Sequence, residues 1–148
     1  MAVFVINEWL WADLSGENGR GHQLKTVTLI ENLVQSNHQI VVIEGSQFDR
    51  KAWSLCKSTN HMVVQAVVAF VVNIRQNSDR CLILKPQAAT ALPAELAAAI
   101  KPDDHYLIQA QFAVEGAIIV TTDAPLRQVL DRAGLPCIFR EEFLDNYF

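Results

Sequence analysis

The fold is decided by one stretch of the chain, Gly116 to Asp123, which reads GAIIVTTD. A turn glycine followed by an apolar run is typical of a strand buried on both faces, and this strand ends on two threonines and an acid. Just before it, DDHYL at 103–107 predicts the start of a helix that runs to about Glu115. Ligands bind at the carboxyl ends of parallel strands, so we expect Asp123 at that edge and Asp104 beside it. Two converging carboxylates predict a site for a hard divalent cation.

Strands alternate with helices outward from this stretch over the whole chain. Apolar runs predict strands at 3–6, 39–43, 80–84, 118–120 and 137–139. Apolar residues at three- and four-residue spacing, with the turn residues between them, predict helices at 23–35, 47–57, 63–75, 92–100 and 124–133, and a helical turn at 141–148. At 63–75 the valine content leaves a strand as the alternative. The segment 7–22 is interpreted as a turn followed by a flexible loop. This alternation predicts a single α/β domain over 1–148, a three-layer α/β/α sandwich on a mostly parallel central sheet.

Composition narrows the class of protein. The chain has 148 residues, 51% of them hydrophobic and 19% charged, and its net charge is −4. An acidic balance argues against a broad basic surface for non-specific nucleic-acid binding, although metal ions can supply positive charge locally in a nuclease. The most apolar run, 62–74, is too short to span a bilayer, and the first residues predict a strand rather than a signal peptide. We therefore expect a cytoplasmic protein with no membrane partner, whose cysteines Cys56, Cys81 and Cys137 are reduced and mostly buried.

Polar side chains close several of the predicted strands. Asn7 and Glu8 end the first strand, Glu44 ends the second, and Asp49 lies in the helix that follows it. With Asp104 and Asp123, these positions can gather several carboxylates at one edge of the sheet. Such a cluster repels itself unless a cation neutralises it, and oxygen ligands of this kind suit Mg²⁺ or Mn²⁺.

At this point the chain resembles the PIN domain family, the metal-dependent ribonuclease fold of VapC-type toxins and RNA-processing nucleases. The resemblance covers nearly the whole length and is best over 103–123, DDHYLIQAQFAVEGAIIVTTD, with the ending CIFREEFL at 137–144 and the opening VFVIN at 3–7. It implies a PIN-like fold, Mg²⁺ or Mn²⁺ as cofactor, and hydrolysis of RNA phosphodiester bonds. For a member of a toxin–antitoxin pair it also implies a protein antitoxin as partner, and a homodimer is compatible with it.

The chain matches the family pattern at two acidic positions and differs from it at two others. Asp104 and Asp123 match it, as catalytic acids and metal ligands. The first family acid is replaced by Asn7, whose amide oxygen can face a metal without bringing charge, and the neighbouring Glu8 is an alternative ligand. For the second family acid, Asp49 is the nearest match and Glu44 its competitor.

Structural explanations compete with each of these assignments. Asp104 and Asp123 both stand where a helix N-cap is expected, and capping alone selects Asp. The tryptophans Trp9, Trp11 and Trp53 are interpreted as core or interface aromatics rather than platforms for base stacking. The rival function is a catalytically impaired PIN-like domain that serves as a binding or assembly module, which Asn7 and the acidic charge favour. A flavodoxin-like or nucleotide-binding domain ranks last, because no glycine-rich phosphate loop follows a strand.

Overall fold

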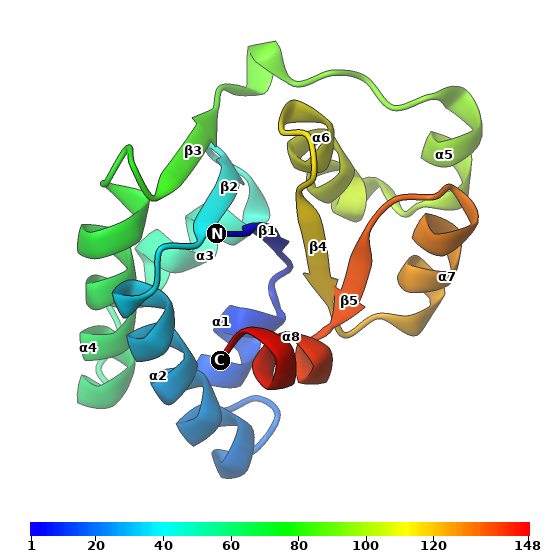
Figure 1. The fold of residues 1–148 in the computed structure, drawn as a ribbon. Helices are drawn as coiled ribbons and strands as arrows, with labels where there is room; N and C mark the ends of the chain where they lie inside the picture. The colour runs from blue at the N-terminus through cyan, green and yellow to red at the C-terminus, as the bar shows by residue number, and fades with distance from the viewer.

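A computed structural model describes all residues 1–148 as five strands with helices between them (Figure 1). The strands are β1 (Val3–Ile6), β2 (Gln39–Ile43), β3 (Cys81–Leu84), β4 (Ile118–Thr121) and β5 (Cys137–Phe139). The α-helices are α1 (Trp9–Leu14), α2 (Arg20–Gln35), α3 (Gln47–Leu55), α4 (His61–Phe70), α5 (Ala94–Ala99), α6 (His105–Ala113), α7 (Ala124–Arg132) and α8 (Arg140–Tyr147). A π-helix, η1 (Val71–Arg75), continues α4, and short 3₁₀ turns occupy Pro86–Ala88 and Pro102–Asp104.

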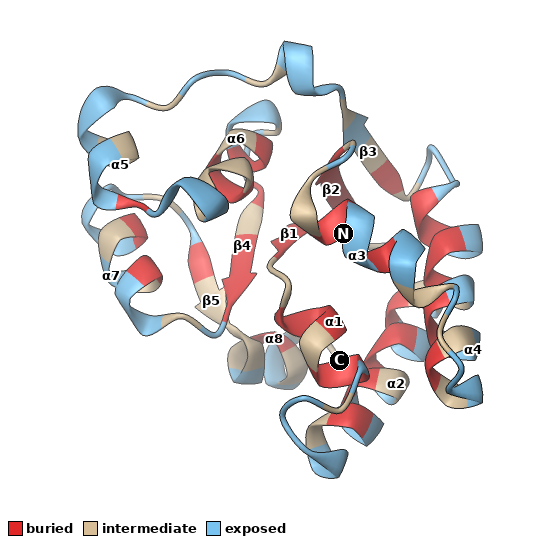
Figure 2. Cartoon of the chain, turned by 180° about the vertical axis from the view of Figure 1, so that it is seen from behind, coloured by how far each residue is buried: buried red, intermediate tan, exposed pale blue.

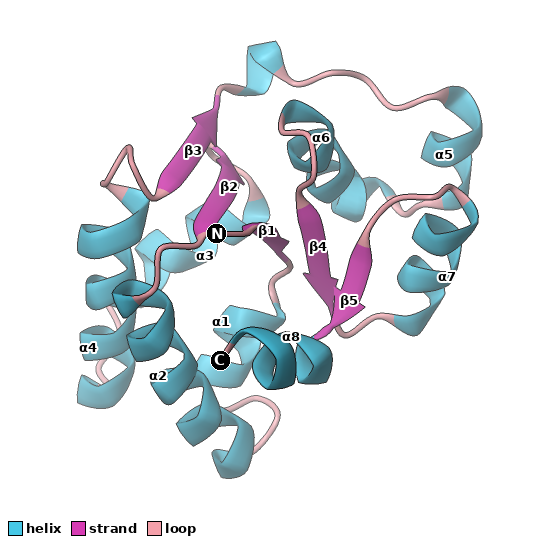
Figure 3. Cartoon of the chain, viewed as in Figure 1, coloured by secondary structure: helices cyan, strands magenta, loops and turns pink.

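All five strands are parallel and lie in the order β3-β2-β1-β4-β5. The predicted three-layer α/β/α sandwich is confirmed, and Figure 3 shows helices on either side of the strands. β1 is central and pairs with β2 on one side and β4 on the other. The chain first adds β2 and β3 on one side of β1 and then β4 and β5 on the other side. The carboxyl ends of β1 and β4 therefore form the switch point at which ligands bind in sheets of this kind.

The two faces of the sheet support two separate cores, because alternate residues of a strand point to opposite faces. Phe4 and Ile6 pack in the larger core, where α1, α2, α3, α4 and α8 contribute apolar side chains. Val5 packs in the smaller core with residues of α6 and α7, such as Leu107 and Leu130. Figure 2 shows that the strands are largely buried while the outer surfaces of the helices are exposed.

The largest departure from the predicted elements is α1, which occupies part of the segment expected to be a turn and a loop. Its six residues are too few to show a helical period, although Leu10 and Leu14 are fully buried. The indole Nε1 of Trp9 donates to the carbonyl of Val120 at 2.9 Å. The indole Nε1 of Trp11 donates to the carbonyl of Phe48 at 3.0 Å. Both bonds are long-range, so tertiary contacts rather than local propensity specify this helix.

Other boundaries differ by a few residues. The second helix begins at Arg20, inside the segment expected to be a flexible loop, and β4 extends to Thr121. The cysteines are free, with Cys81 and Cys137 buried and Cys56 partly exposed. No helix combines the length and the apolar character that a bilayer crossing requires.

Candidate acidic site at the carboxyl edge of the sheet

Asp104 and Asp123 line one cavity of about 210 Å³ beside the end of β4. Asp123 follows β4 by two residues, and Asp104 immediately precedes α6. The rest of the cavity wall is mostly apolar, with one cation, and consists of Ala99, Ile100, Lys101, Pro125, Leu126 and Val129. The structure therefore brings together the two acids that the sequence expected to meet at this edge.

The Asp104 carboxylate is not compensated by the fold. It occupies the N-cap position of α6 but accepts no capping hydrogen bond, so the purely structural explanation as a cap fails for this residue. It also belongs to none of the ion pairs of the structure. Burial, and next the negative charge of Asp123, raise its pKa above the usual range, against a smaller opposite effect of Lys101. A half-buried carboxylate without a donor is suited to binding a cation.

Asp123 has a structural role as well. Its Oδ1 accepts a hydrogen bond from the backbone N–H of Leu126 at 3.1 Å, so the N-cap explanation is confirmed for this residue. Its own backbone N–H donates to the hydroxyl of Thr121 at 3.1 Å. One carboxylate oxygen is thus used in capping α7, and the other has no protein donor. Capping and ligand binding are compatible at this position.

Asn7 links the ends of β1 and β4. Its amide Nδ2 donates to the Thr121 hydroxyl at 3.2 Å, and its Oδ1 accepts from the backbone N–H of Glu8 at 2.6 Å. Its backbone N–H donates to the Val120 carbonyl at 3.1 Å. The side chain is therefore held in place by hydrogen bonds, and it brings no charge to the neighbouring acids.

Glu8 is the third acid of this region. Burial raises its pKa, and Asp104 and Asp103 act in the same direction, while Lys51 is the largest opposing influence. Glu8, which follows the end of β1, is therefore within electrostatic range of Asp104, which precedes α6. It adds a negative charge near Asp104, although neither Glu8 nor Asn7 lines the Asp104–Asp123 cavity.

The two candidates for the second family acid are engaged elsewhere. Asp49 is 3% exposed and forms a two-point ion pair with Arg75, with Oδ1 to Nε 2.7 Å and Oδ2 to Nη2 3.1 Å. Glu44 forms an exposed ion pair with Lys85 at 2.7 Å. Neither residue lines the Asp104–Asp123 cavity. The structure therefore does not bring either of them into this cavity: near the end of β2, Asp49 is compensated by an arginine and Glu44 is solvated.

Two residues of this region carried no signal in the sequence analysis. The hydroxyl of Tyr106 is buried without a hydrogen-bond partner, and burial, then Glu8 and Asp104, raise its pKa. Lys101 lines the cavity and opposes the negative charge of Asp104. Both lie close in sequence to Asp104, and only their position relative to the acids distinguishes them from ordinary loop and helix residues. By contrast, His105 Nε2 contacts the carbonyls of Ile100 and Ala97, which gives it a structural place between α5 and α6.

The oxygen ligands fit a hard cation in their chemistry but are not preassembled. Glu8, Asp104 and Asp123 offer carboxylates, which Mg²⁺ and Mn²⁺ prefer. No three His, Cys, Asp or Glu side chains are grouped closely enough in this structure to hold a metal ion. Metal binding would therefore require at least one of these side chains to rotate.

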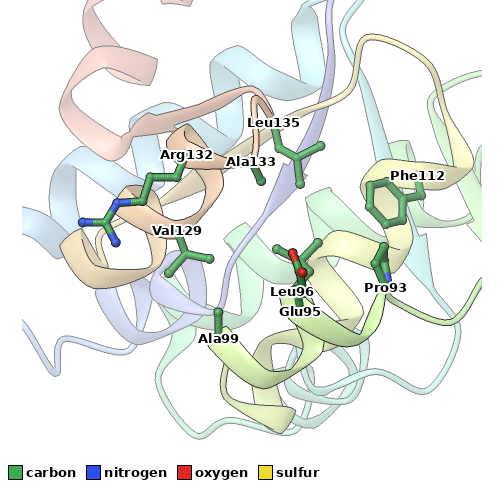
Figure 4. Close-up of a pocket in the computed structure, with 9 residues that line it drawn as sticks. All are labelled: Pro93, Glu95, Leu96, Ala99, Phe112, Val129, Arg132, Ala133 and Leu135. Atoms are coloured by element: carbon green, nitrogen blue, oxygen red, sulfur yellow. The ribbon is translucent and has the colours of Figure 1, made fainter.

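A larger hollow of about 430 Å³ adjoins the acidic cavity and shares Ala99 and Val129 with it. It is mostly apolar and lies between α5, α6 and α7 (Figure 4). The side chain of Arg132 points away from it in that view. The smaller cavity, with its two carboxylates, therefore remains the better candidate for chemistry.

No protein-family model matches the sequence, and no curated protein is significantly similar to it. Assignment of the chain to the PIN family remains a prediction from its motifs.

Proposed function

We propose that this chain is a metal-dependent ribonuclease of the PIN type, with Glu8, Asp104 and Asp123 as its acidic centre. The observation that carries the proposal is the state of Asp104. Its carboxylate has no donor in the fold, shares a cavity with Asp123, and has a raised pKa because of burial and that neighbouring charge. The negative charges of Asp104 and Asp123 lie together without an ion pair, and a bound cation would compensate them.

The roles of the residues follow from their surroundings. Asp104 and the free oxygen of Asp123 would hold Mg²⁺ or Mn²⁺, and Glu8 would complete the negative charge. When bound, such an ion supplies charge stabilisation at the phosphate and an activated water for hydrolysis. Thr121 and Asn7 are positioning residues, because the Thr121 hydroxyl accepts from both the Asp123 backbone and the Asn7 amide. In this proposal Asp49 has no part in metal binding, because Arg75 neutralises it.

Titration of the purified protein with Mg²⁺ or Mn²⁺, read out by cleavage of labelled single-stranded RNA, tests this function. Cleavage should depend on the metal and fall more than about 100-fold in Asp104→Asn, since even residues that only support a metal ligand account for 10–100-fold. The matched control is Glu31→Gln, an exposed acid on α2 in no ion pair. Metal-independent cleavage, or equal activity of Asp104→Asn and Glu31→Gln, would contradict the proposal.

The toxin form of the proposal adds cytoplasmic RNA as target and a protein antitoxin as partner. Expression of the chain alone should then arrest growth, and Asp104→Asn should not. Growth unaffected by an active nuclease would assign the activity to RNA processing instead.

A second candidate, a non-catalytic binding or assembly module, is favoured by the two departures from the family pattern. Asn7 is uncharged and committed to hydrogen bonds, and Asp49 is buried against Arg75. This reading predicts no metal-dependent cleavage by the parent protein. Cleavage by the parent would exclude it, whereas cleavage gained only in Asn7→Asp would identify Asn7 as the cause of the impairment.

A further inference from the structure

The exposed surface on and just after α3 carries three cations. Arg50, Lys51 and Lys57 are exposed on α3 and the turn after it, and Trp53 is exposed between them. We call these four residues the α3 strip. None of its three cations belongs to an ion pair of the structure.

The charge of the α3 strip is unusual for this molecule. The whole chain has a net charge of −4, yet the only acid of α3 is Asp49, which is buried against Arg75. Lys85, Arg127 and Arg140 pair with acids, and Lys25 and Arg132 are unpaired but lie apart on α2 and α7. The strip instead gathers three unpaired cations within 50–57, with no exposed acid between them. The strip is therefore a local excess of positive charge on an acidic protein, and such an excess attracts a polyanion.

Trp53 is exposed, so of the two interpretations given above, a core or an interface aromatic, the core one is wrong. Its exposed fraction is 41%, against 5% for Trp9 and 1% for Trp11. Its ring is supported from within the protein: the guanidinium carbon of Arg75 lies 5.8 Å from the ring centroid, and Asp49 holds that guanidinium. An indole that is held by the fold and open to solvent can stack with a flat partner at little entropic cost.

The α3 strip adjoins the acidic site. The bond from Trp11 Nε1 to the Phe48 carbonyl joins α1, which begins just after Glu8, to the first turn of α3. Burial raises the pKa of Glu8, and Lys51, with a smaller effect of Arg50, lowers it. Cations of the strip and an acid of the proposed centre are therefore close enough to influence each other.

We propose that the α3 strip binds single-stranded RNA and leads it to the acidic site, with a base stacked on Trp53 and phosphates against Arg50 and Lys51. The choice of RNA as the nucleic acid rests on the proposed function. An acidic peptide would use the cations but leaves the supported indole unexplained, whereas single-stranded nucleic acid uses both. The excess of positive charge also supplies the phosphate contacts that the acidic composition of the chain otherwise lacks.

Fluorescence anisotropy of a labelled single-stranded RNA, measured with EDTA present, tests the strip independently of cleavage. Trp53→Ala should weaken binding by about 5- to 100-fold, the range for loss of one stacked base. The double variant Arg50→Gln/Lys51→Gln should weaken binding and lower the slope of log affinity against log salt by roughly 1.4, because two phosphate contacts are lost. Its matched control is Lys25→Gln/Arg132→Gln, which removes two exposed cations from α2 and α7.

A third variant separates stacking from folding. Trp53→Phe keeps a smaller ring and should bind more tightly than Trp53→Ala, while the thermal melts of the two remain alike. The proposal is overturned if the control pair weakens binding as much as the strip pair, or if poly-glutamate displaces RNA equally well from the parent and Trp53→Ala.

The test of the α3 strip and the test of the proposed nuclease can give different results. RNA binding that depends on the strip, in a protein that never cleaves, supports the strip and refutes the nuclease. Metal-dependent cleavage whose KM is unchanged by the strip variants supports the nuclease and refutes the strip.

Discussion

Asp49 and Asp104 each lie in or next to the first turn of a helix, one after β2 and the other before β4, yet their electrostatic surroundings are opposite. Burial alone would raise the pKa of Asp49, but hydrogen bonds from Arg75 and the Gly45 backbone outweigh it, and the pKa is lowered. The pKa of Asp104 is raised by burial and by Asp123, with no hydrogen bond to offset them. One acid is compensated by the fold, and the other is not.

The difference comes from a distant cation that reaches Asp49 and has no counterpart at Asp104. Arg75 reaches Asp49 from η1, a π-helix that continues α4, and π-helical turns are frequent at functional sites. With its partner, Asp49 stabilises the fold and also holds the guanidinium against Trp53. Asp104 accepts no capping hydrogen bond and forms no ion pair, so its carboxylate is free for the metal ion that we propose.

The largest expected effect comes from breaking the compensated acid. Asp49→Asn leaves the Arg75 guanidinium, whose side chain is 10% exposed, without its counter-charge. We expect the free energy of unfolding to fall by about 3–5 kcal/mol, as for other broken buried pairs. Urea denaturation measures this loss.

Glu44→Gln is the control, because it breaks an exposed ion pair at the same edge of the sheet. In that pair the Glu44 side chain is 44% exposed and the Lys85 side chain 67%. That change should cost less than about 1 kcal/mol. Adding Arg75→Met to Asp49→Asn should recover part of the loss, since an apolar replacement has no charge to bury. Equal costs for Asp49→Asn and Glu44→Gln would mean that Asp49 is not the structural acid described here.

The next effect comes from adding a charge to the uncompensated site. Asn7→Asp removes the Nδ2 donor to Thr121 and adds a fourth carboxylate to the region of Glu8, Asp104 and Asp123. In metal-free buffer we expect a loss of about 1–2 kcal/mol, from one hydrogen bond and the added repulsion. Mn²⁺ should restore the stability and bind more tightly than in the parent, as thermal melts at increasing metal concentration would show. If Glu8 already provides the needed charge, Mn²⁺ affinity will be unchanged by Asn7→Asp and reduced by Glu8→Gln.

A smaller effect separates the two roles of Asp123. Asp123→Ala loses the hydrogen bond to the Leu126 backbone and should cost about 1 kcal/mol. Asp123→Asn keeps a capping oxygen and removes the charge, so its stability should equal that of the parent or exceed it in metal-free buffer. Both variants should lose the stabilisation by Mn²⁺ that the parent shows. A loss in Asp123→Asn as large as in Asp123→Ala would argue against charge repulsion at the site.

The sequence was sufficient for the architecture because the sheet is specified by local patterns. Each strand is an apolar run next to a turn, and the predicted parallel sandwich is confirmed. The meeting of Asp104 and Asp123 could also be predicted, since a strand end and a helix start adjoin at one edge in this topology. The helix α1 could not, because long-range bonds of Trp9 and Trp11 stabilise it.

The sequence was insufficient wherever a side chain depends on a distant partner. Nothing near Asp49 indicates that Arg75, far along the chain, neutralises it. The Asp49–Arg75 pair also lies against the ring of Trp53, which the sequence analysis interpreted as a core or interface aromatic. Metal binding, RNA cleavage and family membership all remain predictions.

The smallest expected effect is also the most direct test of the uncompensated acid. Asp104→Asn removes one charge of a repelling pair, so stability at neutral pH in metal-free buffer should rise, on the order of 0.5 kcal/mol as for partly solvated charges. Because the folded-state pKa of Asp104 is raised, its charge opposes folding only once the pH exceeds the unfolded value near 3.9. The advantage of Asp104→Asn should therefore appear as pH rises through the raised pKa and vanish below about pH 4. Thermal melts of both proteins across this range measure it, and a variant less stable than the parent at pH 7 would show that Asp104 is compensated after all.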